Sequence, residues 1–323
     1  MKKLLFGALA ATLCVSASCR AEKSAADGAG ADVPTVYHIS DITPENLVKI
    51  YKALGREAQG KVAVKISTGE SSATNYLRPD FIKPLMDEVH GTIVECNTAY
   101  DGNRRYTADH LKAIEERGFT AIAPCDIMDA DGDVNLPIEG GKHLKYHIVG
   151  SHYPNYDFTV VLSHFKGHQM GGFGGALKNI SIGIGSSNGK AYIHSAGATE
   201  NADSTWRRAA EQKDFLESMA EASKAIADHA GEKILYINVA NNLSVDCDCN
   251  AHPAAPEMND LGIFASLDPV AVDQACVEAV FNAHDEGKEA LIERINSRLG
   301  THTIDHAAEL GVGSKKYQLV ELK

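Results

Sequence analysis

Several signatures of common enzyme classes are absent from this chain. Its 323 residues contain no H-E-x-x-H motif, no C-x-x-C pair and no G-x-x-x-x-G-K-[ST] loop, which argues against zincin-type proteases and phosphate-loop nucleotide binding. Positive charge is also scarce. Lys and Arg number 31 against 43 Asp and Glu, a net charge of −12, which argues against nucleic acid as a partner. The hydrophobic fraction of 44% is typical of globular proteins.

The apolar run at the N-terminus, residues 4–15, is too short to span a bilayer, but it has the length of a signal-peptide core and follows two lysines. Three small residues then precede Cys19, which resembles a bacterial lipoprotein signal. We therefore expect residues 1–19 to be a signal peptide. The protein would be exported to the periplasm or anchored on the outer face of a membrane through a lipidated Cys19. Plain cleavage near Ala17 or Ala21 is the alternative.

The remainder is predicted to be one domain preceded by a tether. Residues 20–34 are small and polar and are predicted to be a flexible linker, because they have too little apolar surface to fold. Strand patterns occur at 61–67, 91–96, 119–123, 146–150, 157–163, 233–239, 261–266 and 317–322, and helix patterns at 41–55, 79–90, 107–118, 203–231, 268–283 and 285–299. This alternation predicts a single α/β domain over 35–323, with a mainly parallel or mixed sheet and helices on both faces.

Residues 163–194 combine histidines, lysines and glycines more densely than any other stretch. Glycine lets the backbone approach a ligand closely, and histidine is the commonest metal ligand and the acid–base residue of neutral pH. The candidates are His164, His168 and Lys178 for catalysis, Lys166, Gly172, Gly174, Gly175 and Asn179 for binding an anionic substrate, and His194 for binding a metal. A tight glycine-rich turn with surface histidines is the alternative interpretation.

The second candidate site is the run Asp246–Cys249. Five cysteines lie beyond the predicted signal, and an odd number argues against a framework made only of disulfides. In extended chain Cys247 and Cys249 project to one face, as two ligands of a soft metal would. Both, with Asp248, are therefore candidate metal ligands. We expect the two cysteines not to bridge each other, and at least one of the two thiols to be free or metal-bound. A redox-active or merely buried pair is the alternative.

Each of these motifs follows a predicted strand. His164 ends one strand, the cysteine pair follows another, and Asp268, a predicted helix N-cap, follows a third. Ligand sites of open α/β sheets lie at the carboxyl ends of strands, so we expect all three motifs to share one pocket. Nitrogen and sulfur ligands together favour zinc, iron or nickel over magnesium or calcium.

The chain resembles the bacterial and archaeal domain-of-unknown-function family 362, often labelled as uncharacterised iron–sulfur centre proteins. The matching stretches are NYLRPDFIKPLMDE at 75–88, ECNTAY at 95–100, SHFKGHQMGGFGGALKNISIGIGS at 163–186, DCDC at 246–249 and LDPVAVDQAC at 267–276. Many relatives carry a ferredoxin-like C-x-x-C-x-x-C insert after the glycine-rich loop. This chain lacks the insert, which argues against an iron–sulfur cluster. The resemblance implies no particular reaction.

A more distant similarity concerns the spacing inside the glycine-rich stretch. His168, the run Gly172–Gly175, Lys178 and His194 reproduce intervals found in lactate racemase and its relatives. In that family the lysine tethers a nickel-pincer cofactor, the distal histidine ligates the metal and the earlier histidine transfers protons. The similarity implies nickel chemistry here, whereas export argues against it, because that cofactor is made inside the cell.

Together these observations predict an exported, metal-dependent enzyme, with redox chemistry as one option, that acts on a small anionic substrate. The site would join the His/Gly/Lys loop to the Cys-x-Cys motif. The alternative is a periplasmic metal- or ligand-binding protein without turnover. A binding protein needs neither an open coordination position nor a titrating base, which distinguishes the two.

Overall fold

The structure is a computed structural model that describes residues 33–70 and 74–323. The predicted signal peptide, the predicted lipidation site Cys19 and residues 20–32 of the predicted linker lie outside the described residues. Residues 33–323 form one compact unit.

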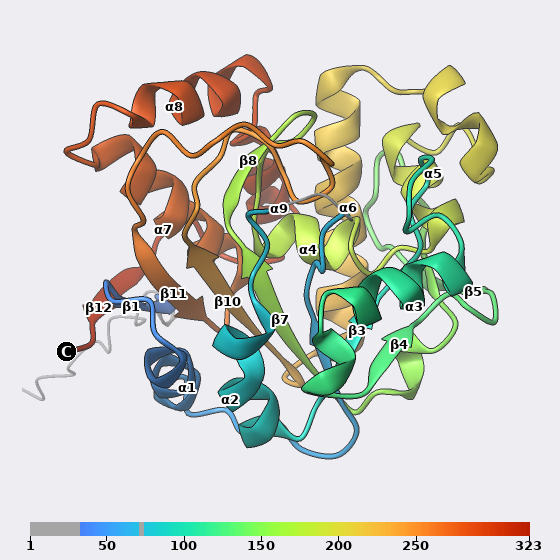
Figure 1. Ribbon diagram of the computed structural model, residues 1–323. Helices are drawn as coiled ribbons and strands as arrows, with labels where there is room; N and C mark the ends of the chain where they lie inside the picture. Colours follow the sequence, from blue (N-terminus) through green and yellow to red (C-terminus); the bar gives the residue numbers. More distant parts are fainter. Residues whose placement is uncertain (1–32, 71–73) are drawn as a thin grey trace, which may run out of the picture. The chain divides into compact units, whose positions relative to one another are not determined.

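An eight-stranded sheet forms the centre of this unit, in the order β12-β1-β11-β10-β7-β2-β3-β4 (Figure 1). In the run β10-β7-β2-β3-β4 each strand is parallel to the next. Strand β11 is antiparallel to both of its neighbours, β1 and β10, and β12 is parallel to β1. The strands are β1 (Thr35–Ile39), β2 (Val62–Lys65), β3 (Thr92–Glu95), β4 (Cys125–Ile127), β7 (Phe158–His164), β10 (Ile234–Ala240), β11 (Gly262–Ser266) and β12 (Gln318–Glu321). The predicted edge strand at 317–322 is β12.

Helices cover both faces of this sheet (Figure 1). Because successive side chains of a strand point to opposite faces, Val64 and Val160 join the core under α1 to α3, whereas Ala63 and Val161 join the core under the later helices. The helices are α1 (Pro44–Ala53), α2 (Pro79–Val89), α3 (Thr107–Glu116), α4 (Ala176–Ser181), α5 (Ser187–His194), α6 (Gln212–Ala230), α7 (Pro269–Asn282), α8 (Lys288–Ser297) and α9 (His302–Glu309). The predicted fold class is confirmed. Among the described residues, none of these helices is long and apolar enough to cross a membrane.

Two small hairpins flank the main sheet. Strands β8 (Lys166–His168) and β9 (Gly172–Gly174) pair within the glycine-rich stretch, and β5 (Asp133–Pro137) pairs with β6 (Tyr146–Gly150). The predicted strand at 119–123 is wrong: a 3-10 helix, Phe119–Ala121, follows Gly118, whose φ of 82° ends α3. Pro124 disfavours further helix, and the strand β4 forms only after it.

The antiparallel direction of β11 decides which loops meet. Strands β7 and β10 are parallel, so their carboxyl ends lie at one edge of the sheet. Strand β11 runs the other way, and its last residue, Ser266, pairs with Tyr236 near the start of β10. The prediction that Asp268 shares a pocket with the other motifs is therefore wrong. Asp268 caps α7 as predicted, accepting hydrogen bonds from the backbone of Val270 and Ala271 at 2.8 and 2.9 Å.

Candidate functional site

A cavity of about 520 Å³ lies at the carboxyl ends of β2, β3, β7 and β10. The loops that follow these strands, with α4 and α5, form its walls, as expected for a parallel sheet. The glycine-rich stretch and the cysteine loop meet here. The predicted site residues that line the cavity are His164, Lys166, His168, Gly174, Gly175, Lys178, Asn179, His194, Cys247, Asp248 and Cys249.

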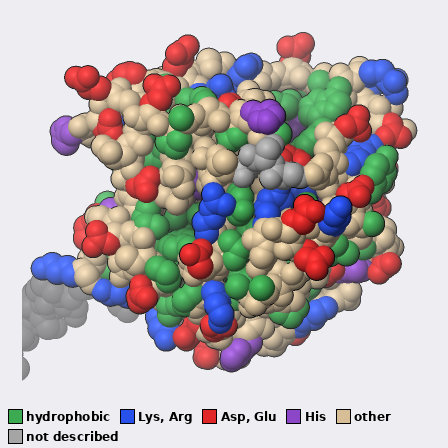
Figure 2. Space-filling view, in the orientation of Figure 1, with side chains coloured by type: hydrophobic (Ala, Val, Ile, Leu, Met, Phe, Trp, Pro, Cys, Tyr) green, Lys and Arg blue, Asp and Glu red, His purple; other side chains and the backbone are tan. Residues whose placement is uncertain are grey.

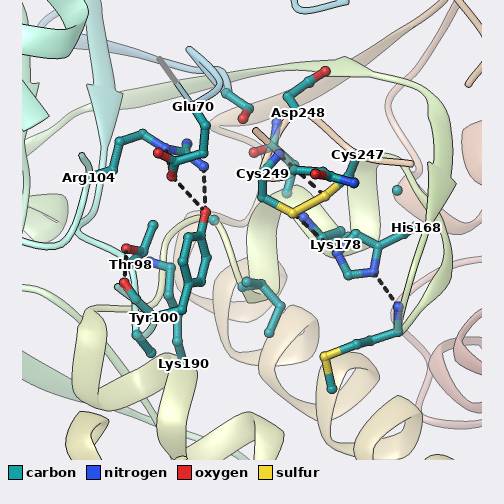
Figure 3. Close-up of a pocket in the computed structure, with 18 of the residues that line it drawn as sticks. Glu70, Thr98, Tyr100, Arg104, His168, Lys178, Lys190, Cys247, Asp248 and Cys249 are labelled. Carbon is teal, nitrogen blue, oxygen red and sulfur yellow. Dashed lines mark hydrogen bonds and ion pairs between the residues drawn. A yellow bond between two sulfur atoms is a disulfide. The ribbon is translucent and has the colours of Figure 1, made fainter. Parts of the chain in front are cut away.

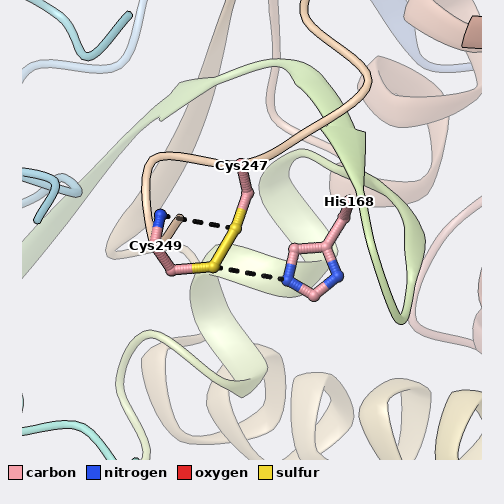
Figure 4. Close-up of side chains that lie close together, drawn as sticks. All are labelled: His168, Cys247 and Cys249. Carbon is pink, nitrogen blue, oxygen red and sulfur yellow. Dashed lines mark hydrogen bonds between the residues drawn. A yellow bond between two sulfur atoms is a disulfide. The ribbon is translucent and has the colours of Figure 1, made fainter. Parts of the chain in front are cut away.

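Cys247 and Cys249 form a disulfide with each other. The prediction that at least one of these thiols is free or metal-bound is therefore wrong. The physical reason is local, because the chain turns at Asp248 instead of running extended, which brings the two Cα atoms to 5.2 Å, within the range that a disulfide spans. The sulfur of Cys249 lies 4.0 Å from Nε2 of His168 (Figure 4).

His168 has a defined tautomer. Its Nδ1 accepts hydrogen bonds from the backbone N–H groups of Gly171 at 2.8 Å and Met170 at 3.2 Å. Nδ1 is therefore unprotonated, and the proton of the neutral ring lies on Nε2, which faces Cys249. Burial, reinforced by the charges of Lys178 and Lys166, holds the pKa of His168 well below its usual value. The ring is neutral at physiological pH.

The spacing of this cluster is compatible with a metal ion, since ligand atoms of His168, Cys247 and Cys249 all lie within 4.8 Å of one another. The chemistry of the donors does not fit a metal in this form. The sulfurs are bonded to each other, and Nε2 carries a proton where a ligand needs a lone pair. A metal would require reduction of the disulfide and loss of both backbone hydrogen bonds at Nδ1.

A second cluster with metal-compatible spacing, His143, Asp214 and Glu217, lies outside the cavity. Lys142 and His143 each contact the Glu217 carboxylate at 2.7 Å, and His302 contacts it at 3.1 Å. Burial alone would raise the pKa of Glu217, but hydrogen bonds from these neighbours outweigh it and hold that pKa well below its usual range. The cluster is an ion network whose cation is already the Lys142 ammonium.

His164, a candidate catalyst, is an anchor for the cysteine loop. Its Nδ1 lies 3.0 Å from the Asp248 carboxylate, and its Nε2 lies 2.6 Å from the carbonyl of Asn241, so both nitrogens face oxygen acceptors. Lys166 donates to the same carboxylate at 2.8 Å. Burial alone would raise the pKa of Asp248, but its contacts with His164 and Lys166 outweigh burial and hold that pKa well below its usual range. These contacts fix the turn that carries the disulfide.

Three lysines line the cavity with no carboxylate at ion-pairing distance among the described residues: Lys65, Lys178 and Lys190. Lys65 donates to a backbone carbonyl at 2.6 Å and to Oδ1 of Asn179 at 3.1 Å, and Lys190 donates to a carbonyl at 2.6 Å. For the ammonium group of Lys178 no hydrogen-bond partner is found within the described part of the chain. On the outer face shown in Figure 2, acidic and basic side chains are interspersed. Within the described residues, the cavity brings together three lysines that have no carboxylate partner.

Burial changes the protonation of these lysines. It lowers the pKa of Lys178 to about 7, with Lys166 and Lys65 adding repulsion, and it lowers the pKa of Lys65 to about 8. An ammonium that has lost water and gained no counter-ion is stabilised by any anion that enters. The lysine cluster therefore favours a negatively charged ligand.

His194 has the opposite tautomer to His168. Its Nδ1 lies 2.7 Å from the carbonyl of Lys190 and must donate to it, which leaves a lone pair on Nε2. The ring stacks on Phe215 with a centroid separation of 4.8 Å and meets Trp206 edge-on. Burial lowers the pKa of His194 to about 4, so this ring is also neutral at physiological pH.

Of the three glycines predicted to bind substrate, Gly174 and Gly175 line the cavity and Gly172 does not. Gly172, a predicted substrate-binding residue, has a φ of +79° and packs against the backbone of Gly300, away from the cavity lining. Gly175 lies above Asp273, whose two oxygens accept the first backbone N–H groups of α4 at 2.7 and 2.9 Å. A Cβ at Gly175 would lie 2.3 Å from that carboxylate, so glycine is required there for close packing. Asp273 thus holds the start of α4, which carries Lys178.

The residues of the opposite wall of the cavity were not predicted from the sequence. Buried Arg104 donates to Glu70 at 3.0 Å and to Glu95 at 3.3 Å, and Tyr100 donates to Glu70 at 3.0 Å. Figure 3 shows this network on one side of the cavity, with His168, Lys178 and the disulfide on the other. The sequence did contain one indication of this wall. Lys65 and Glu95 are charged residues that end two buried, mainly apolar strands, where a charged side chain is unusual.

Comparisons with known proteins give one family and several solved structures, two of which are described below. The model of a domain of unknown function, DUF362, matches residues 62–278, and no curated protein matches. The lactate racemase apoprotein from Thermoanaerobacterium thermosaccharolyticum is 14% identical with a TM-score of 0.44, over 76% of this chain and 56% of that one. A Thermotoga maritima protein is 12% identical with a TM-score of 0.42, over 73% and 57%. The chain spans little more than half the length of either.

Proposed function

The chain belongs to the DUF362 family, as its motifs predicted, and we propose that it is an enzyme that binds a small organic anion in the cavity and transfers protons to and from it. The observation that supports this most strongly is the combination of unpaired lysines with two buried neutral histidines of opposite tautomer. The cavity volume of about 520 Å³ is in the range of small-molecule sites.

Anion binding is the role of Lys178, with Lys65 and Lys190 beside it. Lys178 lacks a partner among the described residues, so its ammonium is free to bind a carboxylate. Lys65 and Lys190 are held by neutral oxygens alone, and their charges remain to attract the ligand. Asn179 fixes Lys65 and donates to the Lys65 carbonyl at 3.1 Å.

Proton transfer is the role of His194 and Lys178, with His168 as a hydrogen-bond donor. His194 offers a lone pair on Nε2 and can accept a proton, whereas the Nε2–H of neutral His168 can donate a hydrogen bond to negative charge that develops on the substrate. Both rings are in these states near neutral pH without a change of protonation. Lys178, with its pKa of about 7, can also exchange a proton near neutral pH.

Exchange of a carbon-bound hydrogen tests turnover. The purified protein is incubated in D₂O with a panel of small 2-hydroxy carboxylates, and loss of the Cα–H signal is followed by NMR. We expect His194→Gln to slow exchange by about 10²-fold or more, while His284→Gln, which changes an exposed histidine, leaves it unchanged. Binding of these carboxylates without any exchange would identify the protein as a ligand-binding protein and would contradict the enzymatic proposal.

No step of this proposal passes through a metal, because the donors of the cysteine cluster do not fit one in the disulfide form. We propose metal binding only for the reduced form, in which His168, Cys247 and Cys249 could supply one nitrogen and two sulfur ligands to zinc, iron or nickel. Elemental analysis before and after reduction tests this. Equal, substoichiometric metal in both forms would contradict it.

Export and lipidation also remain proposals. They are supported by the two N-terminal lysines, the short apolar run and the small residues before Cys19. In a bacterial host, Cys19→Ser should release the protein from membranes to the soluble exported fraction. A wild-type protein that is already soluble after fractionation would contradict lipidation.

A further inference from the structure

We propose that the Cys247–Cys249 disulfide is a thiol–disulfide exchange centre for a small thiol that carries carboxylate groups. The proposal rests on the anion site described above for its choice of substrate. It rests on the position and neighbours of the disulfide for its chemistry. The disulfide lines the same cavity as the unpaired lysines, so a thiol held there by its carboxylates would meet a sulfur atom.

The disulfide is poorly suited to a purely structural role. The entropy that a cross-link removes from the unfolded chain grows with the length of the closed loop, and here the two cysteines are only two residues apart. The turn is already fixed by the hydrogen bonds of Asp248 with His164 and its ion pair with Lys166. The cross-link therefore adds little restraint, which leaves its place in the cavity to be explained.

The surroundings distinguish the two sulfurs. Cys247 is 2% exposed, whereas Cys249 is more open, so an incoming thiolate reaches Cys249 first. Attack on Cys249 expels Cys247 as a thiolate. The backbone N–H of Cys249 points at the Cys247 sulfur from 3.3 Å and stabilises the charge that develops there. A hydrogen bond that stabilises the leaving thiolate lowers its pKa, and a leaving thiol of lower pKa makes exchange faster.

His168 serves the second half of the reaction. Its Nε2–H faces the Cys249 sulfur at 4.0 Å and can stabilise a thiolate at that position. The positive charge of nearby Lys178, which contributes to the low pKa of His168, favours the same thiolate. This accounts for a histidine held by two backbone N–H groups in the tautomer that presents a proton to sulfur.

The exchange balances as follows. A first thiolate, R–S⁻, attacks Cys249, the Cys247–Cys249 bond breaks, and Cys247 leaves as a thiolate and takes up a proton. A second thiolate attacks the R sulfur of the mixed disulfide and releases R–S–S–R and the Cys249 thiolate, which takes up the second proton. Two thiols thus lose two electrons and two protons to the protein, which becomes a dithiol. A small disulfide re-oxidises the dithiol by the reverse steps.

The unpaired lysines determine which thiol reacts. A carboxylate-bearing thiol pairs with Lys65, Lys178 or Lys190 and is concentrated beside the disulfide, whereas a cationic thiol is repelled from the same cavity. Reduced glutathione and cysteamine are suitable probes, because the first carries carboxylates and the second carries an ammonium group.

The experiment measures reduction of the disulfide in the full-length, oxidised protein with EDTA present. Glutathione or cysteamine is added, thiols are trapped by alkylation, and the peptide containing Cys247 and Cys249 is quantified by mass spectrometry. Rates are compared at equal concentrations of thiolate. We expect glutathione to react at least about tenfold faster than cysteamine, and Lys178→Gln to remove most of this difference. In Cys247→Ser, which leaves Cys249 as a free thiol, oxidised glutathione should form a mixed disulfide on Cys249 and release one equivalent of reduced glutathione. Cys125→Ser, which removes a free thiol outside the cavity, should behave as wild type.

Two results would overturn the proposal. A disulfide that neither thiol reduces in the folded protein, although both reduce it after unfolding in urea, would be structural. Equal rates with both thiols would exclude selection of an anionic thiol. Malonate binding, measured on the same preparation, separates this failure from failure of the proposed function. An inert disulfide with intact malonate binding overturns the exchange centre alone.

Discussion

Replacement of Asp248 by asparagine tests the ion network that positions the cysteine loop. Asp248 is buried and accepts from His164 at 3.0 Å and from Lys166 at 2.8 Å. The Asp248→Asn side chain has nearly the same shape, but it brings an NH₂ group towards two donors and leaves the buried Lys166 ammonium without a counter-charge. Removing one partner of a buried ion pair costs about 3–5 kcal/mol. Against a typical total stability of about 5–15 kcal/mol, that is a large fraction.

The assay is equilibrium urea unfolding near neutral pH, with Asp101→Asn as the control. Asp101 also lines the cavity, but it is exposed, and its replacement should change stability by less than about 0.5 kcal/mol. The Asp248→Asn variant should lose about 3–5 kcal/mol, which corresponds to a fall of roughly 10 °C in Tm. A loss below about 1 kcal/mol would refute the assignment of this network as the anchor of the loop.

The pH dependence of this difference has a defined sign. The folded protein holds the pKa of Asp248 well below its usual range, so the carboxylate stabilises the fold at pH values above its unfolded pKa of about 3.9. The stabilisation is lost as the pH falls below that value. The difference between wild type and Asp248→Asn should therefore be largest near neutrality and shrink in acid.

Three further predictions concern other parts of the site. Malonate binding should weaken as the pH rises above about 7, because burial lowers the pKa of Lys178 to about 7 and only the ammonium attracts an anion. Equal affinity at about pH 6 and about pH 9 would contradict this. The Asp273→Ala variant should lose about 2–6 kcal/mol of unfolding free energy in urea, because two buried N–H groups at the start of α4 are left without acceptors. An unchanged urea midpoint would exclude that role of Asp273. In the folded protein an alkylating reagent should modify half-buried Cys125 faster than buried Cys96 and Cys276, as peptide mass spectrometry can measure; equal labelling would contradict the described burial.

The central part of the fold could be predicted from the sequence because its strands are short apolar runs separated by capped helices. β7, Phe158–His164, is apolar along most of its length, and this pattern predicted both its central position and the delivery of His164 to a ligand site. The direction of β11 could not be predicted, because it depends on β1 lying between β11 and β12. That pairing involves residues more than two hundred positions apart, and no local pattern encodes it.

The residue types at the site were predicted better than their roles. The position of the glycine-rich stretch and the cysteine pair after predicted strands correctly predicted that both line one cavity. It could not distinguish the role of His164 from that of His168. One has both nitrogens bound to oxygen acceptors, and the other presents a proton to the cavity. The difference lies in hydrogen-bond partners from other loops, Asp248 among them. The disulfide was missed because extended geometry was assumed where the chain makes a turn.

The central claim is that unpaired lysines make this cavity an anion site, and calorimetric titration with malonate and malonamide tests it most directly. The two probes have nearly the same shape and differ in charge. We expect the wild-type protein to bind malonate and not malonamide near neutral pH, and Lys178→Gln to weaken malonate binding at least about tenfold, as expected for loss of a charge-assisted hydrogen bond. Equal affinity of the wild type for both probes, or unchanged malonate affinity in the variant, would contradict the claim.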